Sequence, residues 1–268
     1  MVQFVPVSRE RHSGKKWRLA DSYSFTARDA LVPIVAAELF RVALAMPIAF
    51  VEHSGRYQLM AMLSFTPGRN MMVGPGGRWL GSHIPAWYRG YPFHLLPREG
   101  GADEAILCID EDSKLIVDGV DAGEDFFDAD GGPSQAVRPI LDMLSEIERN
   151  RKATRLAVSA LSEAGIIQPW PIKLKTAQAE QAITGLHRID ETALNKLGDD
   201  AFLKLRKTAA LPLAYGQLLS MGQVRVLEYL AKLQAAPAQK PAQNVLAMLP
   251  ESIDSLFGMA EDDTVKFK

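Results

Sequence analysis

One short block of the chain combines aromatic rings with arginine side chains. Its chemistry-bearing residues fall within sixteen positions and are Arg78, Trp79, Trp87, Tyr88, Arg89, Tyr91 and Phe93. Planar rings and guanidinium groups are enriched at binding hot spots, because they offer large contact area and directional hydrogen bonds at low entropic cost. The same pattern fits a sheet core whose arginine heads reach water. The block therefore allows two interpretations, a binding surface and a packed core.

Two histidines and one asparagine extend the binding interpretation. His83 and His94 bracket the aromatic block, and Asn70 closes a turn that contains Pro and Gly. The predicted ligand- or partner-binding residues are Asn70, Arg78, Trp79, His83, Arg89, Tyr91 and His94. We assign no catalytic residue. An enzyme of unrecognised type would have His83, His94 or Asp110 in its site.

The sequence patterns of known metal and cofactor sites are missing. The five histidines form none of the spacings typical of zinc ligands, and Cys108 is the single cysteine. The glycine-rich segment 74–77 lacks the Lys-Ser/Thr of a phosphate loop and is interpreted as a turn. Residues 128–131 lack the further acidic ligands of a calcium loop. We therefore expect no metal and no cofactor, and a buried Cys108.

The first half of the chain is predicted to form short strands separated by turns. Residues 48–52 and 57–65 flank a hairpin turn. Residues 105–110 and 114–119 are expected to form another strand pair around residues 111–113. This spacing is typical of an antiparallel sheet.

The most apolar stretch of the chain, residues 30–51, carries two charged residues, Glu38 and Arg41. Central charges are costly in a membrane, so we predict a short buried helix followed by a strand. The charged N-terminal residues lack the apolar core of a secretory signal. The excess of basic over acidic residues in 1–100 is spread out and has no nucleic-acid motif. We therefore expect a soluble cytoplasmic protein that binds no nucleic acid and does not insert into membranes.

Helical periodicity begins near Pro133 and dominates the rest of the domain. Apolar residues recur at helical spacing in 137–147 and 156–161, with Gly165 as a stop and Asp190 as the cap of a later helix. The last strong helix is predicted from about Leu213 to Gln234. Its expected apolar face is Tyr215, Leu218, Leu219, Gly222, Val226, Leu230 and Leu233.

The predicted fold class is α+β. Residues 1–132 are expected to form a mainly antiparallel β-rich region with one helix, and residues 133–234 a helix-rich region of the same globular domain. Residues 235–268 are predicted to be an Ala/Pro-rich linker with a flexible, short amphipathic tail. Its predicted partner-binding residues are Leu249, Ile253, Leu256 and Phe257. Whether this tail docks on its own domain or on a second chain is open, and so is homo-oligomerisation.

Several motifs, in order along the chain, resemble those of the SapC family. The segment PIVAAELFRVALAMPIAFVE resembles the family's opening helix and strand, and GRN with GGRW resembles its Gly-x-Asn and Gly-Arg-Trp pair. IPAWYRGYPF resembles its Tyr-Ile-Pro-Ala-Tyr-x-Arg-Arg-Tyr-Pro-Phe signature. The motifs CID, FFDADGGPS, GLHRIDETALNKLGDDAF and ALPLAYGQLLSMGQ complete the resemblance, which runs from about Phe25 to Gln234.

Two positions depart from the family pattern. Gly90 stands where the family usually has a second arginine, which argues against a double-arginine anion clamp. The pair Gly216 and Gln217 stands where the family usually has Ala-His, so no role of that histidine carries over. The permease of the same name is excluded, because no spanning helix is expected here.

The resemblance implies a link to bacterial surface-layer systems and serum resistance. It also implies a context of TonB-dependent receptors, cupin-like oxygenases and flavin-dependent halogenases. Our leading hypothesis is a non-catalytic binding or accessory protein that recognises a protein or peptide partner. The alternatives are an enzyme acting on a peptide or surface glycan, and a structural surface-layer component.

Overall fold

The computed structural model describes residues 4–97, 105–118, 123–175 and 180–235. The tail residues Leu249, Ile253, Leu256 and Phe257 lie outside the described residues, and so does nearly all of the predicted linker. The chain divides into a compact unit of residues 1–231 and a second unit of residues 232–268. The features below belong to the first unit, except for the last residues of α8, 232–235.

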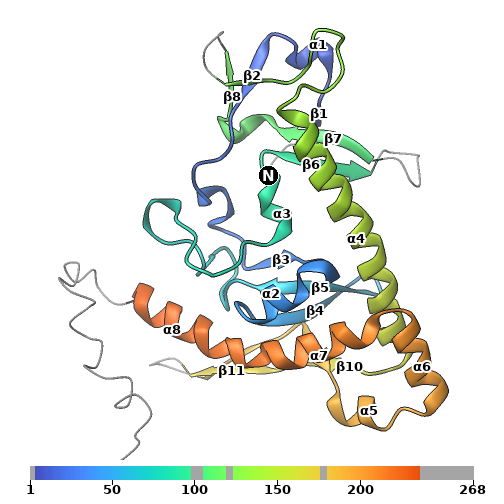
Figure 1. Cartoon of the computed structure of the whole chain (residues 1–268). Coiled ribbons are helices and arrows are strands. Elements are labelled where there is room, and N and C mark those ends of the chain that lie inside the picture. The colour runs from blue at the N-terminus through green and yellow to red at the C-terminus, as the bar shows by residue number, and fades with distance from the viewer. Residues whose placement is uncertain (1–3, 98–104, 119–122, 176–179, 236–268) are drawn as a thin grey trace, which may run out of the picture. The chain divides into compact units, whose positions relative to one another are not determined.

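The largest sheet has five antiparallel strands in the order β10-β13-β4-β5-β3 (Figure 1). Its strands are β3 (Leu31–Pro33), β4 (Ile48–His53), β5 (Arg56–Met62), β10 (Ile167–Pro169) and β13 (Leu186–Ile189). β4 and β5 form the predicted hairpin. Ser54 and Gly55 connect them with φ angles of 51° and 74°, the two positive values that a tight hairpin turn requires. Because β10 and β13 come from the helix-rich half, the two predicted regions share one sheet.

The remaining strands form smaller antiparallel sheets. One has the order β1-β7-β6, another β8-β2-β9, and β11 pairs with β12. Their bounds are β1 (Phe4–Pro6), β2 (Lys15–Trp17), β6 (Phe93–Pro97), β7 (Ala105–Asp110), β8 (Ile116–Asp118), β9 (Glu124–Asp125), β11 (Ile172–Lys175) and β12 (Glu180–Ile183).

The predicted pairing of residues 105–110 with 114–119 is wrong. Both segments contain strands, but β7 pairs with β1 and β6, whereas β8 pairs with β2. The turn between them is a 3-10 turn, η4 (Glu111–Ser113), that ends at Lys114 with a left-handed φ of 60°. This geometry sends the chain into a different sheet instead of folding it back.

Strands outweigh helices in the first half, as predicted. Its helices are single turns, α1 (Arg9–His12), α2 (Leu39–Ala43) and α3 (Ala86–Arg89). α2 followed by β4 is the expected helix and strand of the apolar stretch, and α1 and α3 are two further helices. Its 3-10 turns, apart from η4, are η1 (Ser24–Thr26), η2 (Ala36–Glu38) and η3 (Pro75–Gly77).

The second half is mainly helical. Its helices are α4 (Val137–Glu163), α5 (Glu191–Asn195), α6 (Asp199–Lys207), α7 (Ala210–Ser220) and α8 (Val224–Ala235), with a 3-10 turn η5 (Met221–Gln223) before α8. The two predicted amphipathic stretches belong to the single helix α4. Gly165 has the left-handed φ of 67° that ends a helix, and Asp190 accepts a hydrogen bond from the Ala193 amide as the predicted cap.

The last strong helix, predicted as one helix from about Leu213 to Gln234, is divided into α7 and α8 by η5, and its predicted apolar face is wrong. Leu219 is 74% exposed and Tyr215 is exposed, whereas Gln217 and Ser220 are fully buried. The reason lies in the sheet, because the β13–β4 ladder stops after His187 and Phe50. The helix therefore turns polar side chains toward the unpaired strand ends.

Gln217 replaces a ladder hydrogen bond between β13 and β4. Its Oε1 accepts from the Ile189 amide at 2.9 Å, and its Nε2 donates to the Ile48 carbonyl at 3.1 Å. Ser220 Oγ accepts from the Ile48 amide at 2.9 Å. Buried backbone groups are costly when unpaired, so α7 completes the sheet.

Two hydrophobic clusters form the core. The larger surrounds the five-stranded sheet, and the smaller contains Val5, Trp17, Phe93, Ile109 and Phe126. α4 belongs to both, because Val137 and Leu144 pack in the smaller cluster and Val158 and Leu161 in the larger. α4 is therefore the element that the two cores share.

We predict that Gln217→Leu lowers the free energy of unfolding by about 2–4 kcal/mol, because it leaves the Ile189 amide and the Ile48 carbonyl buried without partners. Urea denaturation followed by circular dichroism measures this loss. Leu219→Gln, on the exposed side of α7, is the matched control and should change stability by less than about 0.5 kcal/mol. Equal stability of the Gln217→Leu variant and the wild type would contradict this role.

Candidate functional site

Glu38 is a buried charge at the start of α2. It ends the 3-10 turn η2 and is only 5% exposed. A buried carboxylate is costly unless hydrogen-bond donors surround it. Its partners therefore indicate which parts of the chain this residue holds together.

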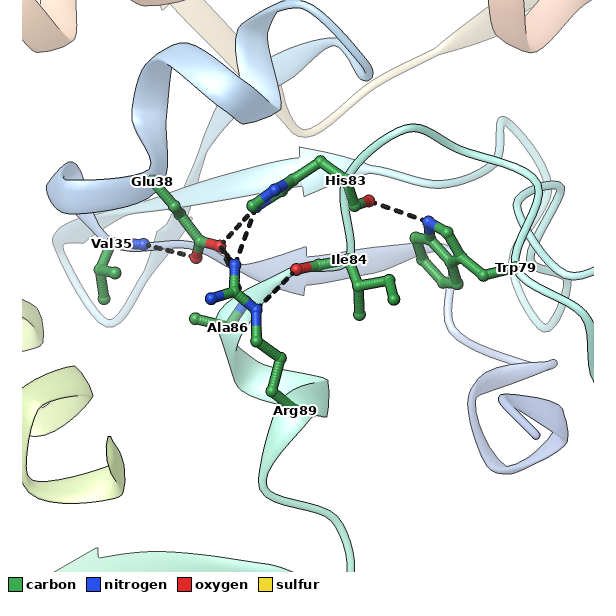
Figure 2. Close-up of polar contacts among 7 residues, drawn as sticks. All are labelled: Val35, Glu38, Trp79, His83, Ile84, Ala86 and Arg89. Carbon is green, nitrogen blue, oxygen red and sulfur yellow. Dashed lines mark hydrogen bonds and ion pairs between the residues drawn. The ribbon is translucent and has the colours of Figure 1, made fainter. Parts of the chain in front are cut away.

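Four donors from two distant segments converge on the Glu38 carboxylate (Figure 2). Oε1 accepts from the Val35 amide at 3.3 Å. Oε2 lies 2.8 Å from the Ala86 amide, 2.9 Å from His83 Nε2 and 3.4 Å from Arg89 Nη2. We call these five residues the Glu38 network. It ties η2 to the segment that carries α3.

The members of the Glu38 network also contact one another. His83 Nε2 lies 3.2 Å from Arg89 Nη2. Arg89 is further held by its Nε, which donates to the Ile84 carbonyl at 3.0 Å. The oxygens of Glu38 are thus occupied by donors. This arrangement suits a structural anchor better than a general base, which must reach a substrate proton.

A cavity of about 250 Å³ opens beside this network. We call it the α4 cleft, because Ile147, Arg151, Thr154, Arg155 and Val158 of α4 form one wall. The other walls come from β5, from η2 with the residues before it, and from α3. The apolar and aromatic lining includes Ile34, Val35, Tyr57, Leu59, Ala86 and Trp87.

Basic side chains lie around the α4 cleft. Arg56, at the start of β5, and Arg155, on α4, line it and are exposed. Neither guanidinium group makes a hydrogen bond or ion pair with the part of the chain that the structure describes. Arg151 also lines the cleft, but Glu148 holds it through bonds of 2.6 and 2.7 Å to its Nε and Nη2. The cleft thus joins apolar walls to unpaired positive charge.

A smaller hollow of about 20 Å³ lies next to the α4 cleft, on the side of β6. It shares Ala86, Trp87, Ile147 and Arg151 with the cleft and also contains His94. His94 is 5% exposed, packs edge-on to Phe4 at 4.5 Å between ring centroids, and lies 4.8 Å from Trp87. Burial lowers the pKa of His94 to about 4, because the imidazolium would be desolvated there. At neutral pH the ring is therefore uncharged.

The structure brings three of the predicted site residues together. His83 and Arg89 belong to the Glu38 network, and Trp79 joins them by donating from Nε1 to the His83 carbonyl at 2.8 Å. Arg78 is exposed and lies outside this arrangement.

The other predicted residues lie in the interior. Asn70 donates to the Thr26 carbonyl at 3.0 Å and accepts from the Met72 amide at 2.9 Å. Tyr91 is buried and donates to Asp110 Oδ2 at 2.8 Å. Their role in ligand binding stays a prediction, and these contacts give each a structural role. Cys108 is buried, as predicted.

Gly90, the departure from the family's second arginine, is a packing site. A Cβ atom there would lie 2.6 Å from Leu144 Cδ2 and 3.1 Å from the Phe93 carbonyl oxygen. A side chain at this position would therefore require the Leu144 side chain or the backbone at Phe93 to move.

Sequence reasoning missed several residues of the site. Glu38 was interpreted only as a charge against membrane insertion, although a lone acid in an apolar stretch is itself a signal of a buried, paired carboxylate. Arg56, Arg151 and Arg155 gave no signal, because they meet only when β5 and α4 pack together.

Within the described part of the chain, no group of three or more His, Cys, Asp or Glu side chains is placed to hold a metal ion. None of the described helices is both long and apolar enough to cross a membrane.

The comparisons with known proteins agree with the motifs. The model of the SapC family matches residues 7–227. The chain belongs to the SapC family. The match begins before the motifs that suggested it and ends within α8. No curated protein and no solved structure matches the chain. The SapC match covers β5, α3 and α4, so the α4 cleft lies within the family region.

We predict that His94 makes stability depend on pH between about 6.5 and 4. An unfolded chain protonates this histidine below about pH 6.5, whereas the folded chain resists protonation down to about pH 4. The unfolded state therefore binds more protons in this window, and the fold loses up to roughly 3 kcal/mol as the pH falls through it.

Urea titrations at several pH values measure this loss. In His94→Phe, which keeps a ring against Trp87, the slope between pH 6.5 and 4 should be smaller than in the wild type. Identical slopes would show that His94 protonates as easily in the folded chain as in the unfolded one.

Proposed function

We propose that this SapC protein is a non-catalytic binding or accessory protein, and that the α4 cleft receives a segment of a protein or peptide partner. The observation that carries the proposal is an apolar-walled cleft beside the Glu38 network, whose hydrogen bonds are already made. Ligand sites in proteins are typically concave and mostly apolar, with a few polar groups that orient the ligand.

The shape of the site favours a segment over a compact molecule. The α4 cleft and the hollow at His94 share Trp87 and Ile147, so they lie next to each other beside α4. Two neighbouring hollows of this kind suit a chain with successive side chains. The cleft volume of about 250 Å³ would accommodate only part of such a segment.

The Glu38 network supports binding over catalysis at this place. Its carboxylate accepts four hydrogen bonds from within the protein, and its histidine is paired with that carboxylate. A reacting group needs a free position from which to move a proton. The network instead presents a fixed wall.

The family context extends the proposal. We infer that the partner belongs to a bacterial surface or TonB-linked uptake or modification system, and that the protein acts in the cytoplasm. The resemblance of the motifs to the SapC family is the support for this setting.

We predict that the wild-type protein will select binding peptides from a random phage-displayed library, and that a substitution that fills the α4 cleft will weaken their binding. Gln58→Trp places an indole on β5 at an exposed position of the cleft lining and should weaken the selected peptides by at least about tenfold, since it occupies their volume. Fluorescence anisotropy with the selected peptides measures the affinity.

Gln135→Trp, an exposed position outside the α4 cleft, is the matched control and should bind like the wild type. Failure to enrich any peptide would contradict the proposal. So would selected peptides that bind the Gln58→Trp variant and the wild type equally well.

A further inference from the structure

We propose that the occupant of the α4 cleft is an acidic segment of the partner, extended along the outer edge of β5. This inference rests on the proposed function and adds the chemistry and the conformation of the segment that the cleft takes.

The first observation is an open strand edge at the cleft. β3 pairs only with Met60–Met62 of β5, and one more bond joins the Ile34 amide to the Leu59 carbonyl at 3.2 Å. The first part of β5, from Arg56 to Gln58, therefore has a ladder partner on its β4 side only.

The register shows which backbone groups face outward. His53 and Arg56 flank the two-residue turn as a hydrogen-bonded pair, so Arg56 and Gln58 direct their amide groups toward β4. The amide groups of Tyr57 and Leu59 then point away from β4, as the Leu59 bond to Ile34 demonstrates. The backbone N–H and C=O groups of Tyr57 have no hydrogen bond to the described residues.

Such an edge is a template for strand addition, in which an incoming chain gains backbone hydrogen bonds and places alternate side chains in pockets. The opposite wall is α4, so the incoming segment would lie between a strand edge and a helix. Along α4, the cleft runs from Ile147 to Val158. At about 1.5 Å per helical residue this is roughly 16 Å, the length of about five extended residues.

The second observation is the charge of the rim. Arg56 stands on the β5 side and Arg155 on the α4 side, both without a partner in the described chain, and Arg151 adds a third guanidinium. The lining carboxylate of Glu38 is already surrounded by donors. Guanidinium groups bind carboxylates through paired hydrogen bonds. Asp or Glu side chains on the added strand therefore match this rim.

Two blocked peptides of equal length test the inference. One alternates Glu with Val and Thr, and the other has Gln at every Glu position. We expect the Glu peptide to bind the wild type about tenfold more tightly, as measured by fluorescence anisotropy, because it alone supplies carboxylates to two unpaired arginines.

Substitutions of the arginines locate this preference. Arg56→Gln and Arg155→Gln should each weaken the Glu peptide by about three- to fivefold and leave the Gln peptide unchanged. Arg149→Gln is the matched control on α4, because Arg149 is exposed, pairs with Glu146 and does not line the cleft. Its affinity for the Glu peptide should equal that of the wild type.

A third peptide tests strand addition. N-methylation of alternate backbone amides removes donors while keeping the carboxylates. Because one of the two alternate sets must face β5, methylating that set should abolish binding and methylating the other should not. Equal binding of both methylated peptides would overturn the extended pairing.

The outcomes separate this inference from the proposed function. Equal affinity for the Glu and Gln peptides, or unchanged affinity in both arginine variants, would overturn the acidic preference. If the phage-selected peptides still bound the wild type and lost affinity for the Gln58→Trp variant, the proposed function would stand while the inference failed. If neither designed nor selected peptides bound, both would fail together.

Discussion

A carboxylate buried beneath the surface can remain charged only where the chain surrounds it with donors, and Glu38 obtains these donors from two parts of the sequence. The Val35 amide is local, whereas His83, Ala86 and Arg89 lie 45 to 51 residues away. Satisfying one side chain therefore places α3 against η2. Trp87 follows Ala86 directly, so the aromatic wall of the α4 cleft is positioned by the same contact. The position of this wall of the cleft is therefore a consequence of how protein donors surround the Glu38 carboxylate.

α4 supplies the opposite wall because it is anchored at both ends. Its first turns pack in the smaller hydrophobic cluster and its last turns under the five-stranded sheet. Between these two ends, Arg151 and Arg155 line the cleft. Gly90 allows α4 to approach α3 closely, since any side chain there would meet Leu144. Glycine at this position thus favours close packing over a charged side chain.

Local signals in the sequence predicted local structure well. The β4–β5 hairpin, the α2–β4 succession, the Asp190 cap and the stop at Gly165 each depend on a few adjacent residues, and all are present. The pairing of β7 with β8 was wrong because strand partners are chosen by the whole sheet. The prediction of the buried face of α7 was wrong because Gln217 is buried to form hydrogen bonds with two strand ends. A pattern of apolar residues does not reveal such a contact.

The site followed the same division. The aromatic and arginine block was visible as a cluster, and Trp79, His83 and Arg89 do meet. The cleft was invisible, because Arg56 and Arg155 are about a hundred residues apart and become neighbours only through packing. The placement of these two positive charges beside an open strand edge is therefore a property of the fold.

Amide hydrogen exchange at Ala86 is the measurement that tests the organising role of Glu38 most directly. In Glu38→Gln the acceptor of the Ala86 amide becomes a neutral amide among donors, so exchange at Ala86 should accelerate by at least about tenfold. The Met72 amide, which donates to Asn70 Oδ1 at 2.9 Å, is the internal reference and should keep its protection. Unchanged exchange at Ala86 relative to Met72 would contradict the claim that the buried carboxylate holds the wall of the cleft.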